Sequence, residues 1–333
     1  MFDVPALLII IILTALIFDF TNGAHDCANA IATVVSTKVL SPRNAVLMAA
    51  ALNLVGAFLG TEVAHTLGSG IVRPDIVGGS NILVLAGLIG AIGWNSLTWY
   101  FGIPSSSSHA LIGGLMGAAL AHAGVDAVNT ASILKKVVLP LLVSPVVGFV
   151  TGLLFMAALS FLFFRVRRST ANAFFRKAQI GSAGFMALSH GLNDAQKTMG
   201  VITLALLIFG QIDDIVVPLW VKCACALAMA LGTSVGGWKI VKTMGHKIFK
   251  LEPVHGFAAE TSAAMVIAGA SAMGAPISTT HTITACIFGV GSTKRLSAVR
   301  WGVAGNLLMA WVLTIPAAAT VGAVSFFILG LIF

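Results

Sequence analysis

Long apolar stretches alternate with short polar segments along this chain of 333 residues. The apolar segments cover 4–37, 44–68, 80–101, 105–124, 137–164, 178–210, 215–237, 255–273, 276–291 and 297–333. About 20 residues of helix span the hydrocarbon core of a bilayer, and several of these segments have that length. The pattern therefore predicts an all-α, polytopic transmembrane protein.

Five segments depart from a plain membrane span. The first, sixth and last are too long for one straight helix, so we expect breaks in them. The segments 105–124 and 276–291 are short, rich in glycine and polar at their start. Short interrupted segments are typical of the broken or re-entrant helices that line binding sites in transporters.

The composition supports a lipid environment. Apolar residues make up 58% of the chain and charged residues 9%, whereas soluble domains carry about 25% charged residues. A soluble protein of this composition would lack the polar surface that water requires. The four cysteines have no metal-ligand spacing and are expected to be buried thiols.

The Lys and Arg residues predict the orientation. If the basic stretch 165–177 faces the cytoplasm, as the positive-inside rule favours, fourteen of the nineteen basic residues lie on that side. Arg73, Lys135 and Lys136 fall on the other side, and two lie within apolar segments. We predict a multi-pass protein of the inner or plasma membrane with both termini outside the cytoplasm.

The chain contains an internal repeat. Residues 23–29 (GAHDCAN) match 191–197 (GLNDAQK) at an offset of 168, and 102–109 (GIPSSSSH) match 274–281 (GAPISTTH) at 172. Residues 59–62 match 231–234, and Pro145 matches Pro316, at offsets of 172 and 171. These pairs predict a first repeat, 1–164, a short basic cytoplasmic linker, 165–177, and a second repeat, 178–333.

An odd number of crossings in each half, about five, would insert the second half with the opposite orientation. Inverted repeats are common in secondary transporters. They give two related conformations, one open to each side, which alternating access requires.

Each half carries an aspartate inside an apolar segment: Asp26, with Asn29 nearby, and Asp194, preceded by Asn193. A carboxylate at bilayer depth is costly unless it is paired or binds a cation. We expect these four residues to bind a coupling cation, with Na⁺ as the metal candidate at both aspartates. The glycine three residues before each aspartate would let the helix open. The alternative is a structural polar contact between helices.

Each half also has a run of hydroxyl residues after a proline. Helix N-termini present free N–H groups and a positive dipole end to anions, and hydroxyls add donors. We therefore expect an anion site, whereas plain N-capping would need a single hydroxyl. The predicted site residues are Ser105, Ser106, Ser107, Ser108, Ser278, Thr279 and Thr280.

These two classes of motif predict symport. Carboxylates beside an anion site would repel the anion unless a cation lies between them. An anion and a cation, H⁺ or Na⁺, should therefore bind together. No other cofactor is expected.

The sequences at 23–30, 102–109, 190–197 and 276–281 resemble the inorganic phosphate transporter (PiT) family over essentially the whole chain. The resemblance implies transport of inorganic phosphate coupled to sodium or protons, and a homodimer with one pathway in each subunit. The substrate would be phosphate, alone or as a metal–phosphate complex. Many members have Asn where this chain has His25, a form similar to bacterial low-affinity, proton-linked members, so the coupling ion stays open.

Four further residues are candidates. Lys197 lies three residues after Asp194, so it could form an ion pair on one helix face or contact phosphate. His25, Glu62 and Glu260 are titratable groups in apolar segments and candidate proton or cation sites.

Other functions fit part of this pattern. An anion channel would also use helix-end sites, but paired carboxylates and inverted halves favour a carrier. A membrane enzyme is less consistent, because adjacent Ser and His residues repeated at two helix starts suit binding rather than a catalytic triad. No nucleotide-binding motif occurs, and no nucleic-acid partner is expected. Sulfate, another tetrahedral oxyanion, is the alternative substrate.

Overall fold

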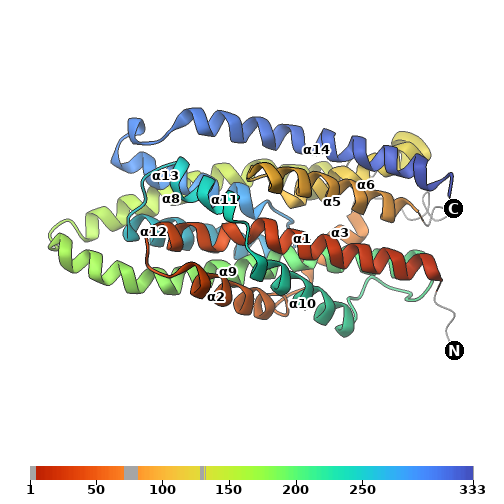
Figure 1. Cartoon of the computed structure of the whole chain (residues 1–333), viewed down its shortest axis with the longest axis horizontal. Coiled ribbons are helices and arrows are strands. Elements are labelled where there is room, and N and C mark those ends of the chain that lie inside the picture. The colour runs from red at the N-terminus through yellow and green to blue at the C-terminus, as the bar shows by residue number, and fades with distance from the viewer. Residues whose placement is uncertain (1–4, 71–81, 128–130, 132, 333) are drawn as a thin grey trace.

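The computed structural model describes residues 5–70, 82–127, 131 and 133–332, and every regular element in this part of the chain is a helix (Figure 1). The all-α prediction is confirmed. The first repeat holds α1 (Ala6–Ser36), α2 (Pro42–Gly56), α3 (Glu62–Gly70), α5 (Leu83–Phe101), α6 (Ser107–Ala123), η1 (Gly124–Ala127), η2 (Ile133–Val138) and α8 (Leu139–Leu162). The second holds α9 (Arg168–Ile208), α10 (Leu219–Val235), α11 (Trp238–Lys242), η3 (Thr243–Lys247), α12 (Pro253–Ala272), α13 (Thr279–Lys294), η4 (Leu296–Ala298) and α14 (Trp301–Leu329).

Several helices are suited to crossing a membrane. By length and composition, five stretches in the described part of the chain qualify, on α1, α5, α6, α8 and α14. A sixth is the bent pair formed by α10 and the α11–η3 segment, which meet at 61°. The fold is therefore that of a multi-pass membrane protein that contains a bent helix pair.

The expected breaks in the three longest segments are wrong. α1 has 31 residues, α9 has 41 and α14 has 29, and each is one continuous helix. At 1.5 Å per residue, α9 is roughly 60 Å long, so it reaches well past the hydrocarbon core. Long helices adapt to the bilayer by tilting or by extending beyond it, and they need no break.

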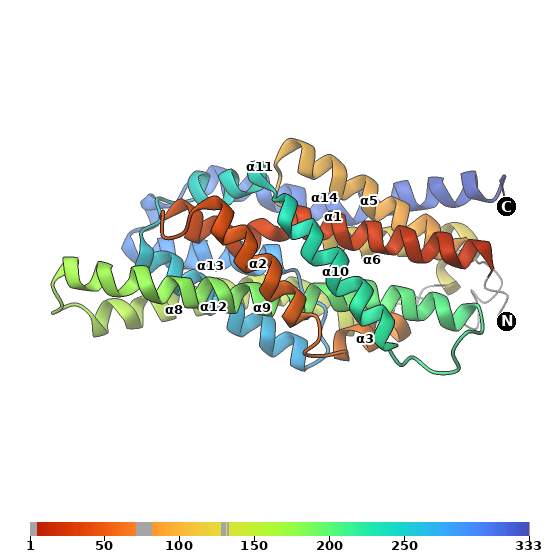
Figure 2. The same cartoon turned by 60° about the horizontal axis from the view of Figure 1, so that its bottom comes forward.

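The helices α1 and α9, which carry the repeated aspartates, run side by side in opposite directions (Figures 1 and 2). Asp19 lies beside Thr198, and Thr33 shares a hydrogen-bonding partner with Ser182. Residue numbers thus rise along one helix as they fall along the other. This is the geometry that an inverted repeat requires of two equivalent helices.

Both termini lie at one end of the molecule, and the turn between α8 and α9 lies at the other (Figure 1). At that far end Arg168 pairs with Glu252 at 3.2 Å, and Arg176 donates to the carbonyl of Lys38 at 3.1 Å. Basic segments that are distant in sequence therefore gather opposite the termini, in keeping with the predicted orientation. α9 begins at Arg168, so most of the predicted linker, 165–177, is helical.

The hydroxyl motifs lie at the tips of two helix pairs. α5 and α6 are neighbours in the half of the molecule that holds the termini, and α12 and α13 are neighbours in the other half (Figures 1 and 2). Gly102 and Gly274, which lie between the helices of each pair, both have φ 67°, a conformation that glycine adopts without strain. The tips meet, with the rings of His109 and His281 4.7 Å apart.

Candidate functional site

The two repeated aspartates lie together inside the bundle. Asp26 on α1 and Asp194 on α9 are 2% and 1% exposed. Their carboxylate oxygens and a ring nitrogen of His190 all lie within 4.8 Å of one another. The fold therefore joins the aspartate motifs of both halves into one cluster.

The hydroxyl motifs reach the same cluster. Asp26 accepts hydrogen bonds from Ser107 at 3.1 Å and from Thr280 at 3.2 Å. Asp194 accepts one from Thr279 at 3.1 Å. Hydroxyls from both motifs thus meet carboxylates from both halves, and Asp26 binds one hydroxyl from each.

The two predicted asparagines differ. The amide of Asn29 donates to Thr279 at 3.2 Å and to Thr280 at 3.0 Å. The amide of Asn193 donates instead to Ser271 on α12 at 2.8 Å, away from the motif hydroxyls. At the repeat position of Asn193 the first half has His25, whose Nδ1 lies 2.6 Å from Asp26. His25 therefore orients Asp26 in a way that Asn193 does not orient Asp194.

Lys197 forms the ion pair considered for it and also contacts a hydroxyl of the first motif. Its ammonium group pairs with Asp194, donates to Ser108 Oγ at 2.5 Å and donates to the carbonyl of Ile277 at 3.0 Å. The residue is 1% exposed. It occupies the position equivalent to Asn29, 168 residues away. The second half thus carries a fixed positive charge where the first half has a neutral amide.

The predicted hydroxyls divide into three roles. Ser106 and Ser278 are N-caps, accepting the backbone N–H of His109 at 3.2 Å and of His281 at 3.1 Å. Ser105 donates to Thr98 at 2.8 Å. The other four lie in the first turns of α6 and α13, where N–H groups have no acceptor within the helix. They are Ser107, Ser108, Thr279 and Thr280.

The two predicted glutamates have different surroundings. Glu260 on α12 is buried and accepts hydrogen bonds from Thr33, Ser182 and, at 3.2 Å, Gln179. Thr33 is one turn beyond Asn29 on α1, so Glu260 adjoins the cluster. Glu62 is exposed at the start of α3 and accepts the N–H of Thr61 at 2.9 Å. It does not join the buried cluster.

The glycines before the aspartates do not open their helices. A Cβ at Gly23 would lie 2.3 Å from the carbonyl oxygen of Met229 on α10. At Gly191 it would lie 2.3 Å from the carbonyl oxygen of Asn53 on α2. These glycines allow close helix packing, and the prediction that the helix opens at them is wrong, because α1 and α9 continue through both positions.

The repeated motifs do not include every buried polar residue near the two aspartates. Buried polar residues on α1 recur at spacings of three and four, which places them on one helix face. They are Asp19, Asn22, Asp26, Asn29 and Thr33. This spacing is readable in the sequence and locates the first two. His190, whose Nε2 lies 3.1 Å from Asp194, is four residues before that aspartate and is readable in the same way.

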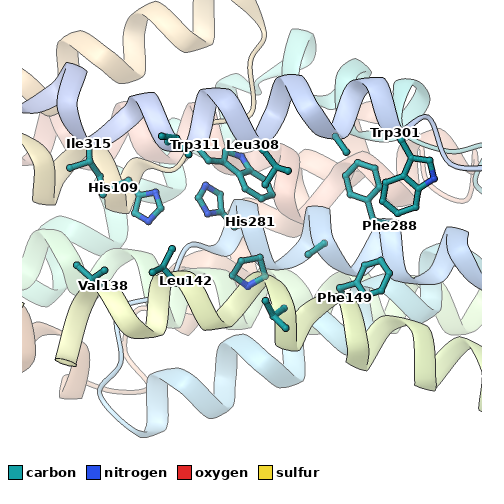
Figure 3. A pocket seen from close by; sticks show the side chains of 15 residues that line it. His109, Val138, Leu142, Phe149, His281, Phe288, Trp301, Leu308, Trp311 and Ile315 are labelled. Atoms are coloured by element: carbon teal, nitrogen blue, oxygen red, sulfur yellow. The ribbon is translucent and has the colours of Figure 1, made fainter. Parts of the chain in front are cut away.

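A cavity of about 670 Å³ lies behind the motif histidines, among α8, α13 and α14 (Figure 3). His109 and His281 line it, and the ring of His281 stacks on Trp311 with centroids 3.8 Å apart. Its other lining residues are apolar or aromatic, and no Lys, Arg, Asp or Glu is among those described. The cavity therefore does not suit phosphate, and the anion-binding groups lie on the side of Asp26 and Asp194.

A multi-pass helical bundle in which two repeated helix N-termini and two acids converge at a buried centre defines the class of membrane transporters. Comparison with known sequences gives the family. The sequence model described as "Phosphate transporter family" matches residues 22–174 and 165–322. This chain belongs to the phosphate transporter family, whose members are transporters and not enzymes.

Individual relatives support this family assignment. A Bacillus subtilis protein is 48% identical over 330 residues, 98% of each chain, and a Rhizobium meliloti protein is 51% identical over 323 residues, 96% of each. Both carry the name "Probable low-affinity inorganic phosphate transporter". Among solved structures, "The sodium-dependent phosphate transporter" superposes with a TM-score of 0.88 at 26% identity, covering 99% of this chain and 100% of that one.

Proposed function

We propose that this protein is a secondary active transporter that moves inorganic phosphate across the cell membrane by symport with a cation, H⁺ or Na⁺. One observation carries the proposal: hydroxyls of both helix-start motifs donate to Asp26 and Asp194. Anion-binding donors and cation-binding acids therefore share one buried cluster, and two ions of opposite charge can bind side by side.

Phosphate would bind between the starts of α6 and α13. Ser107, Ser108, Thr279 and Thr280 offer hydroxyl donors and first-turn N–H groups there. Lys197 already contacts Ser108 and adds a positive charge. Each hydrogen bond to a charged phosphate oxygen is worth about 1.5–3 kcal/mol. A protonated phosphate oxygen could also donate to a carboxylate, which sulfate cannot do at neutral pH.

The cation is assigned to the Asp26 side of the cluster. Lys197 compensates Asp194, whereas Asp26 is paired with a histidine and two hydroxyls. The carbonyl oxygen of Asn29 is buried and has no hydrogen-bond partner among the described residues. A carboxylate, an amide oxygen and a hydroxyl form an oxygen ligand set of the kind that hard cations prefer, and a proton on Asp26 would meet the same charge requirement.

Transport then follows from alternating access. The antiparallel arrangement of α1 and α9 gives each half a counterpart of opposite direction, so exchanging the conformations of the halves would open the cluster to the other side. Binding would be reciprocal: if the cation raises the affinity for phosphate, phosphate raises the affinity for the cation by the same factor.

Uptake into proteoliposomes tests the substrate and the coupling ion together. Labelled phosphate is compared with labelled sulfate, with and without a sodium gradient and at several imposed pH gradients. We expect accumulation of phosphate driven by one of the two gradients. Counterflow separates a carrier from a channel, because only a carrier accumulates label transiently against unlabelled substrate. Equilibration without counterflow would refute the proposal.

Asp26→Asn tests the coupling step. It keeps the side-chain volume and removes the charge, so concentrative uptake should disappear while any residual phosphate binding becomes insensitive to sodium and pH. The matched variant is Asp194→Asn, whose partner Lys197 remains. Gradient-driven accumulation in both variants would show that these acids are structural polar contacts.

Two further features are proposed from the family. We expect a homodimer with a complete site in each subunit, which light scattering of the detergent-solubilised protein checks. We also expect the substrate to be phosphate, alone or as a complex with a divalent metal ion. Uptake assays with and without Mg²⁺, with a chelator as control, distinguish the two forms.

A further inference from the structure

Asp19 is a second buried acid on α1 that the phosphate and cation sites described above leave without a role. It is 0% exposed, and neither carboxylate oxygen has a hydrogen-bond partner of good geometry among the described residues. The Thr198 hydroxyl of α9 and the Cys225 thiol of α10 face it. Burying a carboxylate in this way is costly unless a positive charge reaches it.

The neighbouring polar groups are also unsatisfied. Asn22 is 0% exposed, and both its amide nitrogen and its amide oxygen lack a hydrogen-bond partner in the described part of the chain. The same holds for the hydroxyl of Thr198. Asn22 lies one turn along α1 from Asp19, where side chains three residues apart are neighbours. A carboxylate, an amide and a hydroxyl therefore gather in one place, and their polar atoms have no hydrogen-bond partner of good geometry among the described residues.

The surrounding charges favour a cation there. From α9, the charges of Asp194 and Lys197 act on Asp19, and they oppose each other. Lys197 is already paired with Asp194, so it does not neutralise a further acid. On α1 itself the nearest titratable acid is Asp26, two turns away, which brings no positive charge to Asp19.

The position of Asp19 along α1 indicates from which side of the membrane an ion would reach it before Asp26. The polar face of α1 runs from Asp19 through Asn22, Asp26 and Asn29 to Thr33, a length of about 21 Å at 1.5 Å per residue. Of these five residues Asp19 lies closest to Ala6, where α1 begins, and α1 begins at the end of the molecule where α14 ends (Figures 1 and 2). The charge distribution predicts that this end faces away from the cytoplasm.

We propose that Asp19, Asn22 and Thr198 form an outer cation site, which the coupling ion occupies before it reaches Asp26. The inference rests on the proposed symport. Its ligand is a monovalent positive charge, either a sodium ion held by the three oxygen-bearing side chains or a proton on the Asp19 carboxylate. The site would concentrate the cation on the extracytoplasmic side of the phosphate-binding cluster.

Asp19→Asn tests the site in proteoliposomes of known orientation. Phosphate exchange with equal cation concentrations on both sides should persist, because the phosphate-binding groups are unchanged. The external cation concentration for half-maximal gradient-driven uptake should rise about tenfold or more. If the ion is sodium, this shift appears when sodium varies at fixed pH. If the ion is a proton, uptake instead loses its response to external pH. In both cases the dependence on the internal cation should stay unchanged.

Two companion variants keep the test decisive. Thr198→Val, which removes a neutral ligand and keeps the acid, should shift the same external dependence by a smaller factor. Thr203→Val on the same helix should cause no shift, because that hydroxyl donates to its own helix at Met199. Unchanged external cation dependence in both Asp19→Asn and Thr198→Val would overturn the inference, as would equal loss of exchange and of gradient-driven uptake in both. Failure of the symport proposal would appear already in the unaltered protein, as absence of cation-driven uptake.

Discussion

Replacing Lys197 with methionine should destabilise the protein and abolish phosphate uptake. Methionine keeps much of the side-chain length and removes the ammonium group, which leaves Asp194, 1% exposed, without its ion-pair partner. Removing one partner of a buried pair costs about 3–5 kcal/mol. His190 stays 3.1 Å from the same carboxylate and offsets part of that cost, so we expect about 3–4 kcal/mol.

The measurement is thermal unfolding of the detergent-solubilised protein. A loss of about 3–4 kcal/mol lowers the melting temperature by roughly 4–6 °C, because 333 residues at about 2.1 cal/mol/K each give an unfolding entropy of about 0.7 kcal/mol/K. The double variant Lys197→Met with Asp194→Asn removes both charges and should recover most of this loss, while remaining inactive because the contact with Ser108 is gone. Lys222→Met on α10, which is only partly buried, is the control and should change stability by less than about 0.5 kcal/mol. A single variant as stable as the unaltered protein, or a double variant no more stable than the single one, would refute the buried ion pair.

Three other outcomes are expected. Thr279→Ala and Thr280→Ala should each weaken phosphate binding by about 1.5–3 kcal/mol in equilibrium binding assays; Thr282→Ala, whose hydroxyl donates to its own helix at 2.9 Å, is the matched control, and equal effects at all three would contradict the anion site. A cysteine at position 170 on a cysteine-free background should react with an impermeant reagent from the cytoplasmic side, and labelling from outside alone would reverse the topology. Gly191→Ala should lower the melting temperature markedly, because its Cβ would lie 2.3 Å from a carbonyl oxygen of α2; an unchanged melting temperature would mean that α2 can move away.

Composition and pattern determined much of this protein. Runs of apolar residues predict membrane helices because lipid excludes unpaired backbone groups and most charges. The basic residues predict which end faces the cytoplasm, and the repeated motifs predict two homologous halves. Each of these signals is local or statistical, so it can be read from the sequence without knowing which helices contact each other.

Only the tertiary structure showed which role each residue of the motifs has. Four consecutive serines look alike in sequence, yet Ser106 caps α6 while Ser107 binds Asp26, because the residue at which a helix starts fixes the role of each hydroxyl. The glycine before each aspartate could serve flexibility or close packing, and the nearest carbonyl of the neighbouring helix settles that choice.

Contacts between distant segments were also beyond the sequence. Thr280 reaches Asp26 across 254 positions, and Lys197 reaches Ser108 across 89. Such distances depend on how helices pack against one another, and side-chain chemistry alone leaves many pairings open. The acid at Asp19 is readable as one letter in an apolar segment, but its burial against α9 and α10 exists only in the folded bundle, where water can no longer solvate it.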